Sequence, residues 1–483
     1  MFSNKKLAVA VSGAVLLMAG QFALADSTTD IVDALVSKGV LTEEEGKLIS
    51  KGHETKKKAE GTVTFKDGFK LNSGDGKSSM SIVGRVQLDS RQYGWGSGAS
   101  GGDKINDTFD VRRAYLGAKG TFKKYYDWEV TADFAGLTGG ADSSCSSTPT
   151  VGGTPGTATC SATAAGKTST VLDVAYLNVN YWDKKAMFQF GQFKMPYSLE
   201  ERTSSRFIDF QERSFMNNTS LTPAKERGFM VWGTPFTGIN YALAFSTGQG
   251  KNTNDYDNKE DGKDIIVHAD ANIAEIMGNK EAIIHVGGSY TNGDLPVAGT
   301  GYTTVGKQRT EGRGYEFFSV TNFTVPVERT RYGFESVLAY GPVKFQGEYS
   351  KANFEGVGID KDLDASYVSA LWMITGEKYA DNFKGGKFDR ITPKNEFNPD
   401  FSGLGAIELG VRYSKFDGKD LAAASTTIAN DVDSYTVGIK WIPSANARFM
   451  ANYVRTDFNR DITYASRTQN HEDALLMRAQ YDF

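Results

Sequence analysis

The chain has 483 residues and a formal net charge of −4, so the molecule as a whole is not a binder of polyanions and we predict no nucleic-acid partner. Glycine far outnumbers proline (53 against 11) and there are 22 tyrosines and 30 phenylalanines, which indicates a β-rich protein with many turns. Mean hydropathy is −0.39, a value that soluble proteins share with membrane barrels, because half of each barrel strand faces water. No window after residue 25 holds the about 20 uncharged apolar residues that a membrane helix requires.

Residues 1–25 are predicted to be a secretory signal peptide. Lys5 and Lys6 form a positive start, residues 7–19 are apolar, and the small residues Ala23 and Ala25 mark a cleavage site. The apolar stretch is too short to cross about 30 Å of hydrocarbon as an anchor. We therefore expect the protein to be exported.

Residues 26–60 are predicted to form a periplasmic helical segment. Ile31 and Leu35 lie on one helical face, and Thr42 has the chemistry of an N-cap followed by acidic residues in the first turn. Two roles remain open for this segment. It is either a small helical appendix or a short coiled coil that helps the protein to trimerise or to contact the cell wall.

From residue 61 to residue 483 the pattern has the period of two that is typical of β-strands. Val86 and Leu88 alternate with Arg85, Gln87 and Asp89, and the same alternation recurs along the chain. A strand with one apolar and one charged face is typical of a barrel with lipid outside and water inside, although the strands of a soluble sandwich also alternate.

Four features favour the barrel over the sandwich, and the predicted signal peptide is one of them. The connections alternate between long and short, as extracellular loops and periplasmic turns do. The last strand keeps its alternation to Phe483, so it can close against the first strand. Aromatic residues near strand ends, including Trp128, Trp182, Trp232 and Trp441, fit the girdles at the two lipid–water interfaces. We predict an all-β, transmembrane, antiparallel barrel of about 16 strands in the bacterial outer membrane. A long connection at 376–404, where a short turn is due, leaves room for one more strand pair.

The connection 195–226 is predicted to be a constriction loop that folds into the lumen. It follows a strand that ends near Gly191, and Pro196 cannot donate to a strand ladder. Charged residues of both signs, including Arg202, Arg206 and Arg213, are dense in it.

The two cysteines, Cys145 and Cys160, are predicted to form a disulfide that closes a surface loop, since an exported protein favours oxidation. A metal pair is disfavoured because no histidine lies near them in the sequence. The four histidines, His53, His268, His285 and His471, belong to no catalytic or metal-binding motif, so we predict no enzyme, cofactor or metal.

Alternation places a set of basic residues in the lumen. As a set, with the arginines of the constriction loop, they would form a track for anions, because guanidinium holds phosphate oxygens in a bidentate fork. For any single arginine, a structural ion pair is the alternative role. The predicted lumen cations on strands are Arg85, Arg91, Lys344, Arg412, Lys440, Arg448 and Arg478. On two adjacent strands, His268 and His285 are expected to face the lumen, with Asp270 opposite His285.

Several sequence blocks are similar to the phosphate-selective porin O and P family. They include Gly191-Gln192-Phe193-Lys194 with Pro196, Arg112-Arg113-Ala114-Tyr115-Leu116 and the final strand. The resemblance implies a sixteen-stranded homotrimeric channel in the outer-membrane lipid, which attracts inorganic phosphate or other small anions through luminal arginine and lysine. On matching positions it implies lumen or constriction roles for Arg85, Arg113, Asp133, Arg206 and Arg213.

Two positions depart from that family's pattern. Glu201 stands where strongly phosphate-selective members carry lysine, and residues 264–273 carry His268 and Asp270 where those members carry arginines. We therefore expect an anion-preferring diffusion channel, for phosphate or polyphosphate. The alternatives are a general or organic-acid porin and a structural or adhesive outer-membrane barrel.

Overall fold

The computed structural model describes residues 32–33, 35–65, 68–94, 107–138, 171–218, 220–248, 250–252, 263–295, 297–298, 301–302, 307–320, 323, 325–422, 428–464 and 467–483. The predicted signal peptide, Cys145 and Cys160 lie outside these residues. The chain divides into two compact units, residues 1–64 with 71–79, and residues 65–70 with 80–483.

The first unit contains the helix α3 (Glu43–Glu60) and the strand β1 (Thr62–Thr64). The N-cap predicted at Thr42 is present as a capping box, in which Thr42 and Glu45 satisfy each other's backbone N–H groups. The hydrogen bonds from Thr42 lower the pKa of the Glu45 carboxyl. Gly46 allows close packing here, because a Cβ at this position would lie 2.6 Å from a methyl group of Val36. No helix in the described part of the chain is long and apolar enough to span a membrane.

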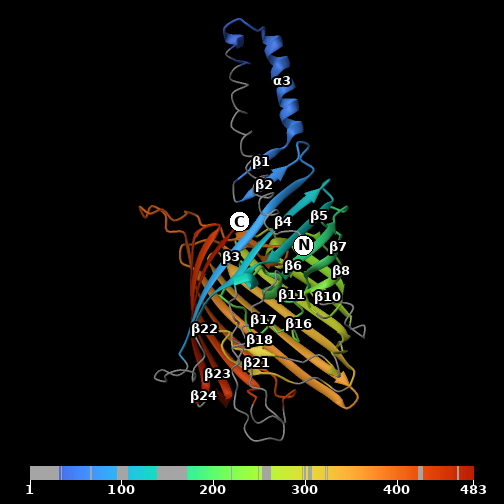
Figure 1. Cartoon of the computed structure of the whole chain (residues 1–483), viewed down its shortest axis with the longest axis vertical. Coiled ribbons are helices and arrows are strands. Elements are labelled where there is room, and N and C mark those ends of the chain that lie inside the picture. The colour runs from blue at the N-terminus through green and yellow to red at the C-terminus, as the bar shows by residue number, and fades with distance from the viewer. Residues whose placement is uncertain are drawn as a thin grey trace, which may run out of the picture. The chain divides into compact units, whose positions relative to one another are not determined.

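The second unit is a closed antiparallel barrel of sixteen strands, which confirms the predicted fold (Figure 1). The strands are β3 (Ser79–Tyr93), β4 (Thr108–Phe122), β5 (Tyr126–Asp133), β6 (Val171–Val179), β7 (Met187–Lys194), β8 (Lys225–Phe236), β9 (Ile239–Ser246), β10 (Asp264–Asn272), β11 (Ala282–Asp294), β16 (Val327–Tyr340), β17 (Val343–Gly356), β18 (Ile359–Met373), β21 (Ala406–Asp417), β22 (Asp431–Ser444), β23 (Ala447–Tyr464) and β24 (Arg467–Asp482). Each strand pairs with its neighbour in sequence, and β24 pairs with β3 to close the barrel.

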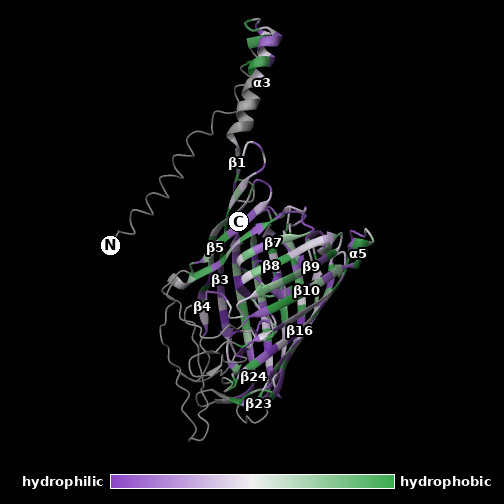
Figure 2. Ribbon diagram, turned by 90° about the vertical axis from the view of Figure 1, so that its right-hand side faces the viewer, coloured by the Kyte–Doolittle hydropathy of each residue, from purple (hydrophilic) through white to green (hydrophobic). Residues whose placement is uncertain are grey.

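Side chains alternate between the two faces of the barrel as the sequence predicts. On β3, Arg85 is 3% exposed and faces inward, whereas the neighbouring Val86 is 43% exposed on the outer face. Figure 2 shows this alternation of polar and apolar residues along the strands. One girdle assignment was wrong: Trp232 faces the lumen, where its indole N–H donates to Asn178 Oδ1 at 3.0 Å.

The barrel closes through its last residue. The Gly84 N–H donates to the Phe483 carbonyl at 2.9 Å, and the Phe483 N–H donates to the Gly84 carbonyl at 3.1 Å. The Phe483 ring lies over Gly84, so that a Cβ on residue 84 would lie 2.3 Å from it. The absence of a side chain at Gly84 thus makes room for the terminal ring.

The long connection at 376–404 adds no strand to the barrel, because β18 pairs directly with β21. Instead it forms a small inward hairpin of β19 (Phe383–Lys384) and β20 (Lys387–Phe388), preceded by the 3-10 turn η2 (Tyr379–Asn382). Gly385 and Gly386 form its turn, both with positive φ (56° and 67°), which suits glycine. We call residues 379–391 the inner hairpin.

Two apolar clusters fill one side of the lumen. The inner hairpin packs Tyr379, Phe383 and Phe388 against Leu199 of the constriction loop and against the walls of β16, β18 and β21. At the other end, Phe215 and Leu221 of the constriction loop pack on Phe317 and Phe318 of the β11–β16 connection. The lumen is therefore narrowed by three segments, and the constriction loop is common to both clusters.

Candidate functional site: a cation-lined channel cavity

A cavity of about 370 Å³ remains open in the lumen. Its wall comes from β3 to β10, opposite the side that the apolar clusters fill, and the constriction loop and inner hairpin complete its lining. Six basic residues line it, Arg85, Lys194, Arg202, Arg206, Lys225 and Lys387. Three acidic residues line it, Glu129, Asp173 and Asp270, so its charge is positive overall.

Three of these cations have no carboxylate partner among the described residues: Arg85, Arg206 and Lys387. Arg85 donates to Ser205 Oγ of the constriction loop at 2.8 Å, and its guanidinium lies 4.2 Å from the centroid of the Tyr115 ring. Lys387 projects from the turn of the inner hairpin and is exposed to the cavity. Positive charge that is not neutralised by an acid is available to an anion passing through the cavity.

The other cavity cations are engaged by the protein. Lys225 pairs with Asp173 at 2.5 Å. Lys194 donates to the Thr203 carbonyl at 2.9 Å and lies 3.8 Å from Oε1 of Glu201. Glu129, by contrast, accepts only from the Tyr176 hydroxyl, at 3.1 Å, and has no cationic partner in the described part of the chain.

The constriction loop is held by hydrogen bonds between its backbone and the barrel wall. It contains the short helix α4 (Leu199–Arg202), whose first N–H groups at Leu199 and Glu200 donate to the Glu348 carboxylate at 2.9 and 2.7 Å. A carboxylate at a helix N-terminus satisfies donors that have no partner within the helix. Further along, the Gln211 N–H donates to Asn452 Oδ1 at 2.7 Å.

Buried ion pairs complete the anchoring of the loop. Oε1 of Glu212 in the loop forms ion pairs with Nε of Arg112 at 3.1 Å and with Nη2 of Arg478 at 3.0 Å. Arg412 bridges Glu200 of the loop at 3.3 Å and Glu311 of the β11–β16 connection at 2.6 Å. These arginines fix the path of the loop through the lumen.

The predicted site residues therefore separate into two groups. Arg85, Arg202 and Arg206 line the cavity, and Arg202 is also ion-paired there with Asp270 and Glu335. The remaining six lie inside the barrel with protein partners. Two are held by hydrogen bonds: Arg113 donates to Gln87, and Asp133 accepts from the backbone N–H groups of Ala114 and Ala135. Four form ion pairs: Arg213 with Glu201, Arg412 with Glu200 and Glu311, Lys440 with Glu408, and Arg478 with Asp89 and Glu212.

The expected histidine pair also comes together, although in a different register. His285 lies opposite Asn272, and Asp270 lies opposite Gly287, so the predicted pairing of Asp270 with His285 was shifted by two residues. The side chains nevertheless meet, because Nδ1 of His285 is 3.9 Å from Oδ1 of Asp270.

Sequence reasoning missed Lys194, Lys225 and Lys387 as cavity cations. Lys225 is the first residue of β8 and lies directly opposite Lys194 of the Gly-Gln-Phe-Lys block, so strand pairing was the signal that pointed to it. Lys387 lies in a hairpin whose strands have two residues each, too short for an alternation to be recognised.

A closed sixteen-strand barrel with an apolar outer face and a polar lumen is the architecture of an outer-membrane channel. The model of the family "Phosphate-selective porin O and P" matches residues 81–483, so the chain belongs to this family. Porin O of Pseudomonas aeruginosa is 22% identical over 444 residues, which cover 87% of this chain and 92% of the relative.

Comparison with solved structures bears on the fold alone. The high-pH structure of Pseudomonas putida OprB has a TM-score of 0.50 at 10% identity, covering 85% of this chain and 95% of that chain. The outer-membrane channel DcaP of Acinetobacter baumannii has a TM-score of 0.48 at 11% identity, covering 84% of this chain and 97% of that chain. By its family the protein is an outer-membrane porin, located in the bacterial outer membrane, and this family is one of channels.

Proposed function

We propose that this porin is a passive diffusion channel that prefers anions, with inorganic phosphate or polyphosphate as its leading solute. The observation that carries the proposal is the charge of the cavity: six cations and three acids line it, and Arg85, Arg206 and Lys387 are without a carboxylate partner among the described residues. A water-filled channel selects ions by its width and by the charge of its lining.

Phosphate suits this lining because guanidinium groups bind its oxygens in a bidentate fork and keep their charge at any physiological pH. Arg85 and Arg206 supply two such groups, and Lys387 adds a point charge. Several weak sites in series, rather than one tight site, allow passage as well as entry.

The departure at Glu201 weakens this proposal less than the sequence suggests. Its carboxylate is 3.1 Å from Nε of Arg213 and 3.8 Å from Nζ of Lys194, and it is not part of the cavity lining. An acid whose charge is matched by two cations contributes little repulsion to a passing anion.

The first test is the reversal potential of the channel in a planar bilayer under a potassium chloride gradient, followed by titration with phosphate. We expect anion preference and a fall in chloride current at millimolar phosphate. Arg206→Gln should reduce both, whereas Arg455→Gln should change neither, because Arg455 is on the outer face, paired with Asp457 at 2.9 Å. Cation preference, or an unchanged chloride current in phosphate, would overturn the proposal.

The same recording separates the alternatives. A general or organic-acid porin would conduct with anion preference but show the same block by carboxylates as by phosphate. A structural or adhesive barrel would show no open-channel conductance at all.

We also propose that the signal peptide 1–25 is cleaved and that residues 26–60 form a periplasmic helical segment, which is available for cell-wall contact. The barrel then spans residues 61–483 and includes the constriction loop 195–226. We propose further that Cys145 and Cys160 form a disulfide and that the protein is a homotrimer. Mass spectrometry of the mature protein and light scattering in detergent would test these. A start other than Asp26, a free thiol, or a monomer mass would each reject the corresponding part.

A further inference from the structure

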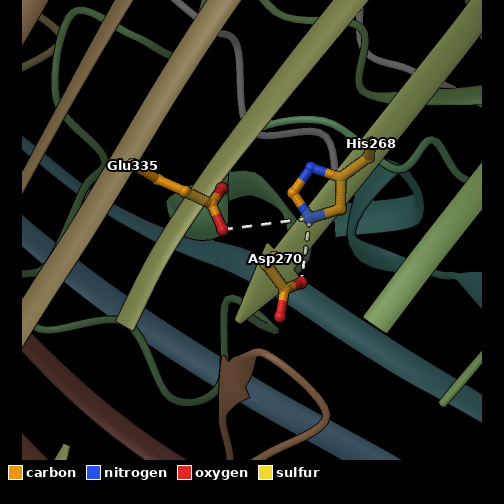
Figure 3. A group of neighbouring side chains, drawn as sticks. All are labelled: His268, Asp270 and Glu335. Atoms are coloured by element: carbon orange, nitrogen blue, oxygen red, sulfur yellow. Dashed lines mark hydrogen bonds and ion pairs between the residues drawn. The ribbon is translucent and has the colours of Figure 1, made fainter. Parts of the chain in front are cut away.

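A cluster of two histidines and two carboxylates lies where the barrel wall, the constriction loop and the inner hairpin meet. His268 and Asp270 are on β10, His285 is on β11 and Glu335 is on β16. All four side chains are at most 3% exposed. Figure 3 shows His268 between the two carboxylates.

Three atoms of this cluster have the chemistry and spacing of metal ligands. Nε2 of His268 is 2.9 Å from Oδ2 of Asp270 and 3.9 Å from Oε1 of Glu335, and the potential ligand atoms of these three residues lie within 4.8 Å of one another. One imidazole with two carboxylates suits a divalent transition metal such as zinc, since calcium and magnesium prefer oxygen ligands alone.

The neighbouring groups are placed as an outer shell for these ligands. Nδ1 of His268 is 2.8 Å from the Ser289 hydroxyl, which leaves Nε2 free to bind a metal when Nδ1 carries the proton. His285 Nε2 is 2.9 Å from Oε1 of Glu335, and the Asn240 amide donates to Oδ1 of Asp270 at 2.7 Å. Such partners orient metal ligands and are part of the strength of a site.

Two buried polar atoms of the cluster, Oε2 of Glu335 and Nδ1 of His285, have no hydrogen-bond partner among the residues that the structure describes. Glu335 is 2% exposed, and an unsatisfied carboxylate oxygen at such a depth has a cost that a bound cation would remove. The protein supplies one cation itself, because Arg202 of the constriction loop lies 3.3 Å from Oδ2 of Asp270 and also pairs with Oε1 of Glu335.

We propose that His268, Asp270 and Glu335 form a binding site for a divalent transition-metal ion of the zinc class, and that this ion competes with Arg202 for the two carboxylates. Arg202 occupies Oδ2 of Asp270 and Oε1 of Glu335, the two oxygen atoms paired with Nε2 of His268, so an ion held by that nitrogen and both carboxylates would have to displace it. Two carboxylates and Arg202 leave a charge of −1, whereas a divalent ion neutralises the pair completely. The ion can reach the site from the channel, because His268 and Asp270 line the cavity.

Displacement of Arg202 would release the last residue of α4 from β10 and β16, while Leu199 and Glu200 remain bound to Glu348 and Glu201 remains beside Lys194 of β7. Arg202 would then add an unpaired positive charge to the cavity. The ion therefore acts on the part of the constriction loop that narrows the channel.

The test is calorimetric titration of the full-length protein in detergent with zinc chloride, in buffer without chelators, so that its result does not depend on channel activity. His268→Ala should weaken binding at least about tenfold, since it removes a ligand. Arg202→Gln should strengthen binding, because it removes the competing cation. His471→Ala should bind as the wild type does, since His471 lies 3.6 Å from Asp473 and outside the cluster.

A strengthening in Arg202→Gln is the decisive readout, since a purely structural role of Arg202 predicts no such gain. Equal zinc binding by the wild type and His268→Ala would overturn the proposal, and so would unchanged affinity in Arg202→Gln. If His268→Ala shows no folded band on an unheated gel, the same titration is done with Glu335→Gln. We expect this variant to bind zinc at least about tenfold more weakly than the wild type, and equal binding would overturn the proposal.

Discussion

At the scale of single residues, the role of a lumen arginine depends on what lies opposite it. Arg206 and Arg213 are seven residues apart in the same loop, and both are partly shielded from solvent. Arg206 has no acidic partner in the described part of the chain and lines the cavity. Arg213 instead pairs with Glu201 at 3.1 Å and donates to the carbonyls of Glu200 and Thr203, both at 3.0 Å. The first is placed to meet a solute, and the second stabilises the loop.

This difference predicts the behaviour of Arg213→Gln. The substitution leaves the buried Glu201 carboxylate without its closest cation, which costs about 3–5 kcal/mol when one partner of a buried pair is lost. We expect a noisier single-channel current and faster hydrogen exchange in residues 199–214, with the sign of selectivity retained. The double variant Glu201→Gln/Arg213→Gln should be quieter than the single one, since it removes the unpaired charge. If the current of Arg213→Gln were as quiet as that of the wild type and phosphate no longer blocked it, Arg213 would instead contact the passing anion.

The sequence alone could predict which side chains point inward, because strand alternation depends only on local spacing. It could not predict their partners. Arg412 pairs with Glu200 and Glu311, which belong to two different loops and are distant from it in sequence. No local sequence pattern predicts such a contact. The register of β10 with β11 failed for a related reason: α5 (Ile273–Ile276) and the turn after it set the pairing, and a two-residue difference in that turn moves every opposite pair.

At the scale of elements, two inward segments depend on each other. Leu199 of the constriction loop packs in the same apolar cluster as Tyr379, Phe383 and Phe388 of the inner hairpin. The constriction loop was predictable, since Pro196 and a run of charges follow a clear strand. The inner hairpin was not, because its strands have only two residues each and its anchoring rings contact walls that are remote in sequence.

Release of the inner hairpin should widen the channel. In the double variant Phe383→Ser/Phe388→Ser, two buried rings are lost, and each loss costs about 3–5 kcal/mol for a large-to-small change in a core. We expect a larger single-channel conductance and weaker anion preference, because Lys387 then leaves the cavity with the hairpin. Phe401→Ser is the matched control, since Phe401 belongs to the same connection and is 72% exposed. An unchanged conductance in the double variant would mean that the hairpin does not narrow the conducting path.

At the scale of the whole barrel, the fold follows from a physical requirement that the sequence displays throughout. A strand in lipid must have every backbone group paired, so the sheet has to close on itself. The alternation to the last residue predicted this closure, and the pairing of Leu475 with Gln92 and of Tyr481 with Val86 confirms it. What alternation did not reveal is the ring of Phe483 lying over Gly84 at the seam.

The contact of Phe483 with Gly84, where β24 meets β3, predicts that a methyl group added at residue 84 disturbs closure of the barrel. A Cβ there would lie 2.3 Å from the Phe483 ring, so Gly84→Ala must push the ring away, and overpacking of this kind costs about 1–3 kcal/mol. The matched control is Gly288→Ala on β11, where a Cβ would meet only the Gly333 carbonyl, at 3.8 Å. We expect Gly84→Ala to fold more slowly in detergent and to lose its compact band on unheated gels at a lower temperature than the wild type, whereas Gly288→Ala should behave as the wild type does. Gly84→Ala/Phe483→Leu should recover part of the loss, because a smaller side chain leaves room for the methyl group. If Gly84→Ala instead closed as fast and resisted heat as well as the wild type, the terminal ring would have no part in holding β24 to β3.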